Sequence, residues 1–112
     1  MSDLTNPEDL KLVTLARAAR ARIASSAGAA VRDQDGRTYS GATVELATGS
    51  VSAVQLAVAT AMASGAKSLE AVVVLGEQFS EADSVAARAV IQSGGLLIEC
   101  ATNGDVASVT IA

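Results

Sequence analysis

The 112-residue chain contains no histidine, no tryptophan and a single cysteine, Cys100. The lack of histidine excludes a serine–histidine–aspartate triad and every metal site that needs an imidazole ligand. One cysteine cannot form an internal disulfide, and it fits a reducing compartment. Because no histidine can activate it and it ends an apolar segment, we expect Cys100 to be a buried, inert thiol.

Aromatic side chains are also scarce, since Tyr39 and Phe79 are the only two. Half of the residues are hydrophobic, and many of these are alanine. This composition predicts a packed globule, and the length predicts a single domain over residues 1–112. Alanine buries little area per residue, so the core of one copy would be thin. We therefore expect an oligomer that buries further surface.

The chain is acidic, with a net charge of −4 and a pI of about 4.6. This charge disfavours nucleic acid as a partner. Arg17, Arg20 and Arg22 form a local basic group, which we interpret as a solvated helix face. No apolar run reaches the ~18 residues that would span a membrane. The first residues lack a signal-peptide pattern, so we predict a cytoplasmic protein without a membrane partner.

The order of elements is predicted from apolar periodicity and from capping and turn residues. Three helices are expected, from Asn6-Pro7 to about Ser25, from Thr48-Gly49-Ser50 to about Ser64, and from Ser80 to about Ser93 with Gly94-Gly95 as its stop. Strands are expected over residues 28–32, 37–45, 69–75, 96–98 and 106–111. The apolar second helix should be buried on several sides. Strand–helix–strand steps imply a parallel pair, so the predicted fold is α/β, a three-layer α-β-α sandwich around a mixed sheet of about five strands.

Four strings of residues resemble motifs of the cytidine deaminase family. Gly28-Ala29-Ala30-Val31 is similar to the family's V-G-A-A-x strand, and Gly41-Ala42-Thr43-Val44-Glu45 to its G-x-N-V-E string. Ser52-Ala53-Val54-Gln55-Leu56-Ala57 falls where the family has C-A-E-R-T-A, and Phe79-Ser80-Glu81-Ala82-Asp83 falls where it has P-C-x-x-C. The resemblance covers nearly the whole chain. It implies a cytidine deaminase-like fold and a homodimer or homotetramer.

The departures from the family lie at the positions that carry its chemistry. A zinc deaminase needs a histidine or cysteine plus a cysteine pair as ligands, and a glutamate that moves protons. The aligned ligand positions here are Ser52, Ser80 and Asp83, and the glutamate position is Val54. Hydroxyls are poor zinc ligands at neutral pH, and valine carries no proton. We therefore predict no catalytic residues, no metal ligands and no cofactor.

The resemblance implies that Thr43 and Glu45 are the candidate substrate-binding residues, at positions where the family holds the nucleoside ribose. Thr43 replaces an asparagine and so lacks its amide, and a plain strand residue is the simpler interpretation. For Glu45 the simpler interpretation is a carboxylate at a strand end, in solvent or capping a turn. For Ser52 and Ser80 the simpler interpretation is helix capping; an anion site between two helix starts is the alternative, which Asp83 would oppose.

Three hypotheses for function follow. The first is a non-catalytic relative that acts as an oligomeric binding or scaffold protein, with the second helix at or near a subunit interface. The second is a binder of nucleosides or other small molecules that uses the remnant pocket around Thr43 and Glu45. The third is an enzyme, either a cytidine deaminase or another hydrolase, although the missing ligands argue against zinc chemistry.

Overall fold

The first helix begins where the sequence predicts and ends at Arg22, before the predicted end near Ser25. The computed structural model describes residues 4–112, and its helix α1 spans Pro7–Arg22. The Asn6 side chain accepts a hydrogen bond from the backbone N–H of Glu8 at 2.9 Å, which caps the helix. Glu8 and Asp9 lie in the first turn and Arg20 and Arg22 in the last, so charges at both ends suit the helix dipole.

Five strands form one mixed sheet in the order β2-β1-β5-β6-β7. Their bounds are Gly28–Asp33 for β1, Thr38–Ala42 for β2, Leu69–Leu75 for β5, Ile91–Cys100 for β6 and Val106–Ile111 for β7. Strands β5 and β6 are parallel and are joined through a helix, whereas the other neighbouring pairs are antiparallel. The predicted parallel step is therefore confirmed.

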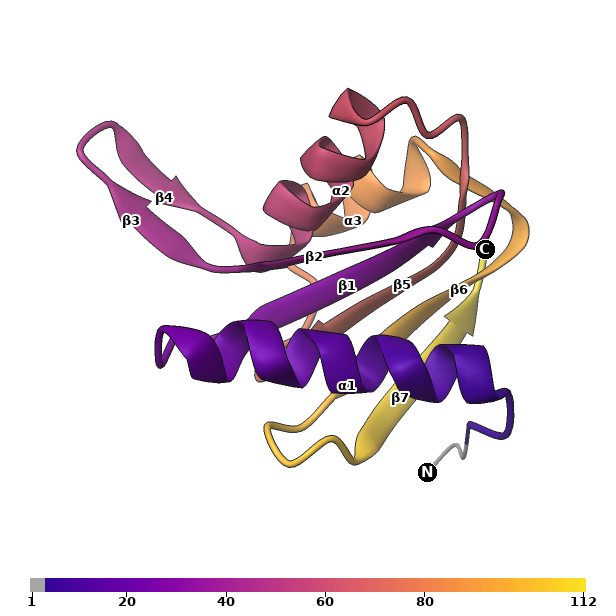
Figure 1. Cartoon of the computed structure of the whole chain (residues 1–112), viewed down its shortest axis with the longest axis horizontal. Helices are drawn as coiled ribbons and strands as arrows, with labels where there is room; N and C mark the ends of the chain where they lie inside the picture. Colours follow the sequence, from indigo (N-terminus) through magenta and orange to yellow (C-terminus); the bar gives the residue numbers. More distant parts are fainter. Residues whose placement is uncertain (1–3) are drawn as a thin grey trace.

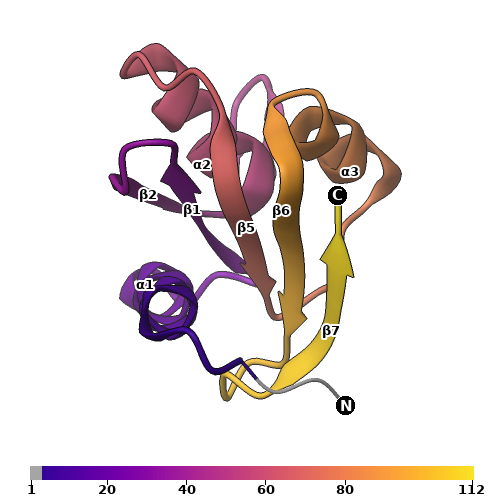
Figure 2. The same cartoon turned by 90° about the vertical axis from the view of Figure 1, so that its right-hand side faces the viewer.

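Helices cover both faces of this sheet. Helix α1 lies on one face, and α2 (Ala53–Ala63) and α3 (Glu81–Arg88) lie on the other (Figures 1 and 2). The three-layer α-β-α arrangement predicted from the sequence is confirmed. Among the described residues, no helix is long and apolar enough to cross a membrane.

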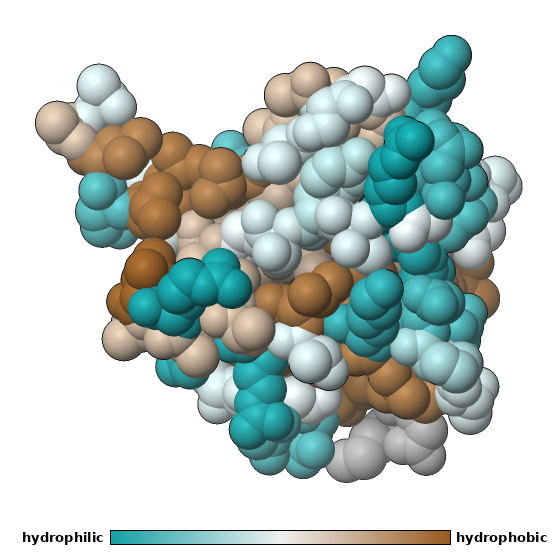
Figure 3. Space-filling model, in the orientation of Figure 1, coloured by the Kyte–Doolittle hydropathy of each residue, from teal (hydrophilic) through white to brown (hydrophobic). Residues whose placement is uncertain are grey.

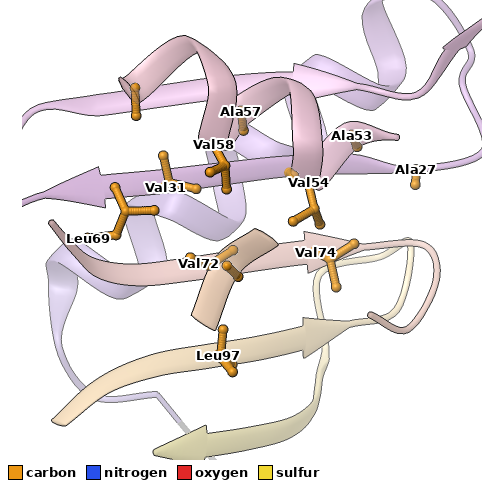
Figure 4. Close-up of a cluster of buried hydrophobic side chains, with 13 residues drawn as sticks. Ala27, Val31, Ala53, Val54, Ala57, Val58, Leu69, Val72, Val74 and Leu97 are labelled. Atoms are coloured by element: carbon orange, nitrogen blue, oxygen red, sulfur yellow. The ribbon is translucent and has the colours of Figure 1, made fainter. Parts of the chain in front are cut away.

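Each layer boundary has its own core. The core under α2 and α3 joins Val54 and Val58 of α2 to alternate strand residues such as Val31, Val72 and Val74 (Figure 4). The core under α1 uses the residues between them, with Ala30, Val73 and Ile98 facing the helix. Because successive strand residues face opposite sides, the continuous apolar run of β5 serves both cores.

Polar contacts also hold α1 in place. Arg32 on β1 is nearly buried and forms ion pairs with Asp9 of α1 at 2.9 Å and with Glu70 of β5 at 2.8 Å. Burial alone would lower the pKa of Arg32, but the bonds to Glu70 and Asp9 outweigh it and raise this pKa. The guanidinium therefore stays charged and links three elements. Nearby, Gly28 is required, because a Cβ there would lie 2.0 Å from the carbonyl oxygen of Ala16.

A projecting hairpin replaces the predicted start of the second helix. Residues 48–50 were expected to open that helix, but Gly49–Val51 is strand β4, which pairs with β3 (Val44–Leu46). Gly49 has a φ of +132°, a conformation that suits a tight turn between strands and that other residues rarely adopt. The helix begins later, at Ala53, where the side chain of Ser52 accepts from the N–H of Gln55. The strand expected over residues 37–45 is accordingly divided into β2 and β3.

The third helix is shorter than predicted. It ends at Arg88 rather than near Ser93, and β6 already begins at Ile91. Gly94-Gly95 is therefore not a helix stop but an irregularity inside β6, where Gly94 has a φ of +81°. A Cβ on Gly95 would lie 2.6 Å from Cγ1 of Ile91, so the chain bends back on itself here. A glycine pair is as suitable for such a bend as for ending a helix.

The turn between β1 and β2 is organised by the buried carboxylate of Asp33. Its Oδ1 accepts the backbone N–H groups of Asp35 and Arg37, both at 2.9 Å, and Oδ2 accepts from the Tyr39 hydroxyl at 3.3 Å. Burial alone would raise the pKa of Asp33, but the donors from Arg37, Asp35 and Tyr39 outweigh it and lower this pKa. The ionised form of Asp33 therefore stabilises the fold.

We predict that Asp33→Asn lowers the free energy of unfolding most at neutral pH. A carboxyl with a lowered pKa in the folded state contributes stability above its unfolded pKa of about 3.9 and loses it as the pH falls through the folded value. Urea denaturation from about pH 7 to about pH 3 should show the difference between wild type and variant shrinking on acidification. Glu77→Gln, at an exposed position, is the control. A difference that stays constant over this range would contradict the role of the ionised carboxylate.

Candidate functional site

Ser52, Ser80 and Asp83 meet where α2 and α3 begin. Ser52 is the N-cap of α2, and Ser80 is the N-cap of α3. The Ser52 hydroxyl donates to Oδ1 of Asp83 at 2.7 Å, and the backbone N–H of Asp83 donates to the Ser80 hydroxyl at 3.0 Å. The capping roles predicted for both serines are confirmed, and Ser52 meets two residues about 30 positions further along the chain.

The carboxylate of Asp83 is the centre of this cluster. The residue is 2% exposed, and its Oδ1 also accepts from Nε2 of Gln55 at 3.3 Å. It lies in the first turn of α3 and accepts from two residues in the first turn of α2, so both helix dipoles favour its negative charge. The anion site considered between these helix starts is thus filled by the protein's own carboxylate. We call the cluster of Ser52, Gln55, Ser80 and Asp83 the helix-start latch.

The latch does not fit a zinc ion. Its donor atoms are two hydroxyls, one carboxylate and one amide, and hydroxyls of this kind stay protonated at neutral pH. Among the described residues no three histidine, cysteine, aspartate or glutamate side chains lie close enough to hold a metal together. Val54, which the sequence resemblance places at the position of the family's glutamate, is fully buried in the core under α2. The donor atoms of the latch therefore do not fit zinc, and the Val54 side chain cannot carry a proton.

Thr43 has a structural role beside the latch. Its hydroxyl accepts from the backbone N–H of Ala53 at 3.0 Å, which adds a second cap to the start of α2. Its carbonyl oxygen accepts from the Ser25 hydroxyl at 2.7 Å, and its own N–H donates to the carbonyl of Ala27 at 3.1 Å. Thr43 thereby separates β2 from β3 and fixes the base of the projecting hairpin.

Glu45 lies on that hairpin, which we call the arm (residues 44–51). It is exposed, and its carboxylate accepts from the Ser50 hydroxyl at 3.0 Å across the two strands. The arm extends away from the sheet and helices (Figure 1). Glu45 and Thr43 are close in sequence, but in a single chain neither lines the groove between α2 and α3.

A shallow groove of about 560 Å³ lies between α2 and α3, beside the latch. Its lining is mainly apolar and consists of Gln55, Glu81, Ala82, Val85 and Ala86. Val85 is 65% exposed, so the groove is open to solvent. It contains no paired carboxylates positioned for acid–base work, because Glu81 is its only acidic lining residue.

Two further contacts near the site were not anticipated from the sequence. Glu99 on β6 accepts from the backbone N–H of Phe79 at 2.8 Å and from the Ser108 hydroxyl at 2.8 Å. Glu99 therefore fixes the loop that leads into α3, and only the strand pairing brings it there.

Cys100 is buried as predicted. Its burial and, to a smaller extent, the charge of Asp105 raise its pKa to about 11, which keeps the thiol protonated.

Comparison with known proteins agrees with this fold. The family model described as cytidine deaminase-like matches residues 5–104. The crystal structure of cytidine deaminase from Burkholderia pseudomallei is 26% identical, with a TM-score of 0.76 and 90% of each chain covered. Cytidine deaminase from Mycobacterium leprae is 21% identical with a TM-score of 0.73, covering 96% of this chain and 94% of that one. The enzyme from Mycobacterium tuberculosis is 20% identical with a TM-score of 0.71, covering 82% and 85%.

No curated protein sequence matches the chain significantly. The two mycobacterial structures support the fold alone, since their identity is low. The family match nevertheless extends over most of the chain, and it includes strands β1 to β6, all three helices and the latch, but not β7. The chain therefore belongs to the cytidine deaminase-like family.

Proposed function

We propose that this chain is a single-domain, non-catalytic member of its family that works as an oligomeric binding or scaffold protein. The observation that carries the proposal is the helix-start latch, in which Ser52 donates to the buried carboxylate of Asp83 at 2.7 Å. These residues stand at the positions aligned with zinc ligands. In a zinc deaminase, the metal generates hydroxide from water near neutral pH and a glutamate moves protons. Here the latch and Val54 supply neither step.

The latch also explains how the fold persists without a metal. A structural metal contributes folding free energy by tying its ligands together. Asp83 does the same with hydrogen bonds, since it joins the first turns of α2 and α3. A hydrogen bond to a charged group contributes roughly 1.5–3 kcal/mol, so each donor from α2 would stabilise the contact between the two helices.

Surface composition supports self-association as a homodimer or homotetramer. Large apolar side chains are exposed on several elements: Leu10 47%, Ile23 55%, Leu46 55%, Val85 65% and Ile111 71%. Apolar surface extends along the arm in Figure 3. Helix α2 also leaves Ala59 and Ala63 exposed, although its sequence predicted burial on several sides. Covering such surfaces would complete the thin, alanine-rich core.

We also propose a cytoplasmic location, with which the buried lone thiol of Cys100 is in keeping.

The competing hypothesis is a nucleoside binder in which Thr43 and Glu45 contact the ligand. The two residues keep the spacing of the family's ribose-binding string. However, the Thr43 hydroxyl is engaged with the N–H of Ala53, and Glu45 points into solvent on the arm. An enzyme, whether a cytidine deaminase or another hydrolase, is the third hypothesis. It would need acid–base groups that the groove, with Glu81 as its only acid, does not supply.

We predict strong energetic coupling between Ser52 and Asp83. A double-mutant cycle of Ser52→Ala and Asp83→Ala, measured by urea denaturation, should give a coupling free energy of about 1–3 kcal/mol, because Ser52→Ala removes a donor from the buried Asp83 carboxylate. The matched control is the exposed pair on the arm, Ser50→Ala and Glu45→Ala, for which coupling below about 0.5 kcal/mol is expected. Equal coupling in the two cycles would show that the latch does not hold the helices together.

We predict that the purified protein holds far less than one zinc per chain and does not deaminate cytidine. The variant carrying Ser52→Cys, Ser80→Cys and Asp83→Cys should bind about one zinc per chain, because it places three thiolates at the latch. A control variant with Ser50→Cys, Ser80→Cys and Asp83→Cys has one of its three thiols on the arm. It should not bind stoichiometric zinc. Elemental analysis and a cytidine deamination assay measure both properties. Stoichiometric zinc with turnover in the wild type would refute a non-catalytic role.

We predict that nucleosides and nucleotides do not raise the Tm of the protein in a thermal-shift panel. The scaffold hypothesis requires no ligand, and the groove has little polar chemistry to orient a sugar or base. A rise in Tm that disappears in Glu45→Ala and persists in Glu77→Ala would favour the nucleoside binder. Glu77 is suited to the comparison because it is also an exposed glutamate.

A further inference from the structure

Strand β7 forms an open edge of the sheet. It is the last strand in the order β2-β1-β5-β6-β7, and Figure 2 shows no strand beyond it. Within the described part of the chain, β6 is the one element against which β7 packs extensively, whereas β2 at the other edge is packed by both α1 and α2. An edge strand carries unpaired backbone N–H and C=O groups that can bind another strand.

The sequence of β7 lacks charged residues and proline, two of the features that protect such an edge. Val106–Ile111 reads VASVTI. Valine, threonine and isoleucine favour extended backbone. One irregularity is present: Ser108 pairs with Glu99 and Val106 with Cys100, so Ala107 is an extra residue in a bulge. Regular backbone is therefore available from residue 108 onward.

The hydrogen bonds of Ala112 show which backbone groups of β7 point away from β6. Its N–H donates to the carbonyl of Gly95, and its carbonyl accepts from the N–H of Gly94, so both of its groups point toward β6. In an antiparallel ladder this direction alternates along the strand. The N–H and C=O groups of Val109 and Ile111 therefore point toward the open edge.

The same two residues carry apolar side chains on the face that α1 partly covers. Val109 pairs with Ile98 and Ile111 pairs with Leu96, and Ile98 belongs to the core under α1. Helix α1 packs mainly against β1, β2 and β5, so this end of the sheet is left open. Ile111 is 71% exposed as a result. Thr110 lies on the opposite face, because it pairs with Leu97.

We propose that β7 pairs in an antiparallel manner with β7 of a second copy, about a two-fold axis at Thr110. In this register Val109 of each copy is opposite Ile111 of the other. The outward N–H and C=O groups of both residues are therefore all paired. A register centred on Val109 would instead place Ile111 opposite the bulged Ala107. The inference rests on the oligomer of the proposed function and names one of its interfaces.

A second copy fits this edge better than an unrelated chain. The edge has no charge with which to select an acidic or basic partner, and its apolar pair, Val109 and Ile111, complements itself. Two copies that each carry a net charge of −4 repel one another, and an uncharged strand is where they can approach most closely. A two-fold axis also closes the contact at two copies.

A disulfide-trapping experiment tests the register directly. Residues facing each other across a two-fold between antiparallel strands have Cα atoms roughly 4.5–5.5 Å apart, within disulfide range. Thr110→Cys should therefore form a disulfide-linked dimer under mild oxidation. Ser108→Cys on the same face should not, because its nearest copy would be about 13 Å away at about 3.3 Å per residue. The native Cys100 is buried, so the background is low.

Charge substitutions at the axis give a second readout. Thr110→Lys places two ammonium groups opposite each other and should weaken dimerisation roughly tenfold, with Thr110→Glu behaving alike. Mixing the two variants should restore dimers in sedimentation measurements. Equal cross-linking of both cysteine variants, or a Thr110→Lys protein as dimeric as the wild type, would overturn the β7 interface and leave the non-catalytic proposal standing. Zinc-dependent turnover would overturn that proposal without moving the cross-link.

Discussion

The hydrogen bond between the Ser52 hydroxyl and the Asp83 carboxylate is the contact on which the account of this molecule depends. It joins two helix starts that are 31 residues apart in the chain, and it does so with a buried charge. A buried carboxylate needs donors, and here the capping serine of α2 and the Gln55 amide provide them. The space that a metal ion would need between these residues is bridged by a 2.7 Å contact.

The rest of the fold is independent of that chemistry. The sheet has separate cores on its two faces, and α1 is fixed to the far side by Asp9 and Arg32. The layers are therefore held mainly by these two cores, and the latch adds a polar contact between the starts of α2 and α3. Fold and activity are separable in such a protein, and the fold alone is a poor guide to what it does.

The sequence predicts much of this fold and only part of the site. Apolar periodicity and capping residues located α1, the buried strand β5 and the cap Ser80, whereas the family resemblance singled out Ser52. The prediction of a helix start at Thr48-Gly49-Ser50 was wrong, because serine, threonine and glycine suit a helix start and a hairpin equally well. Gly94-Gly95 misled for the same reason, since glycine both ends helices and allows bends in strands. The Ser52–Asp83 bond and the Glu99 contact to Phe79 could not be predicted, because each depends on how distant elements are placed.

The most direct test of the account is a crystal structure determined from protein grown and crystallised with zinc, using anomalous scattering at the zinc absorption edge. The account predicts no anomalous peak between the starts of α2 and α3, and a direct hydrogen bond from the Ser52 hydroxyl to the Asp83 carboxylate. A zinc peak there, with Ser52 and Asp83 moved apart to coordinate it, would contradict it.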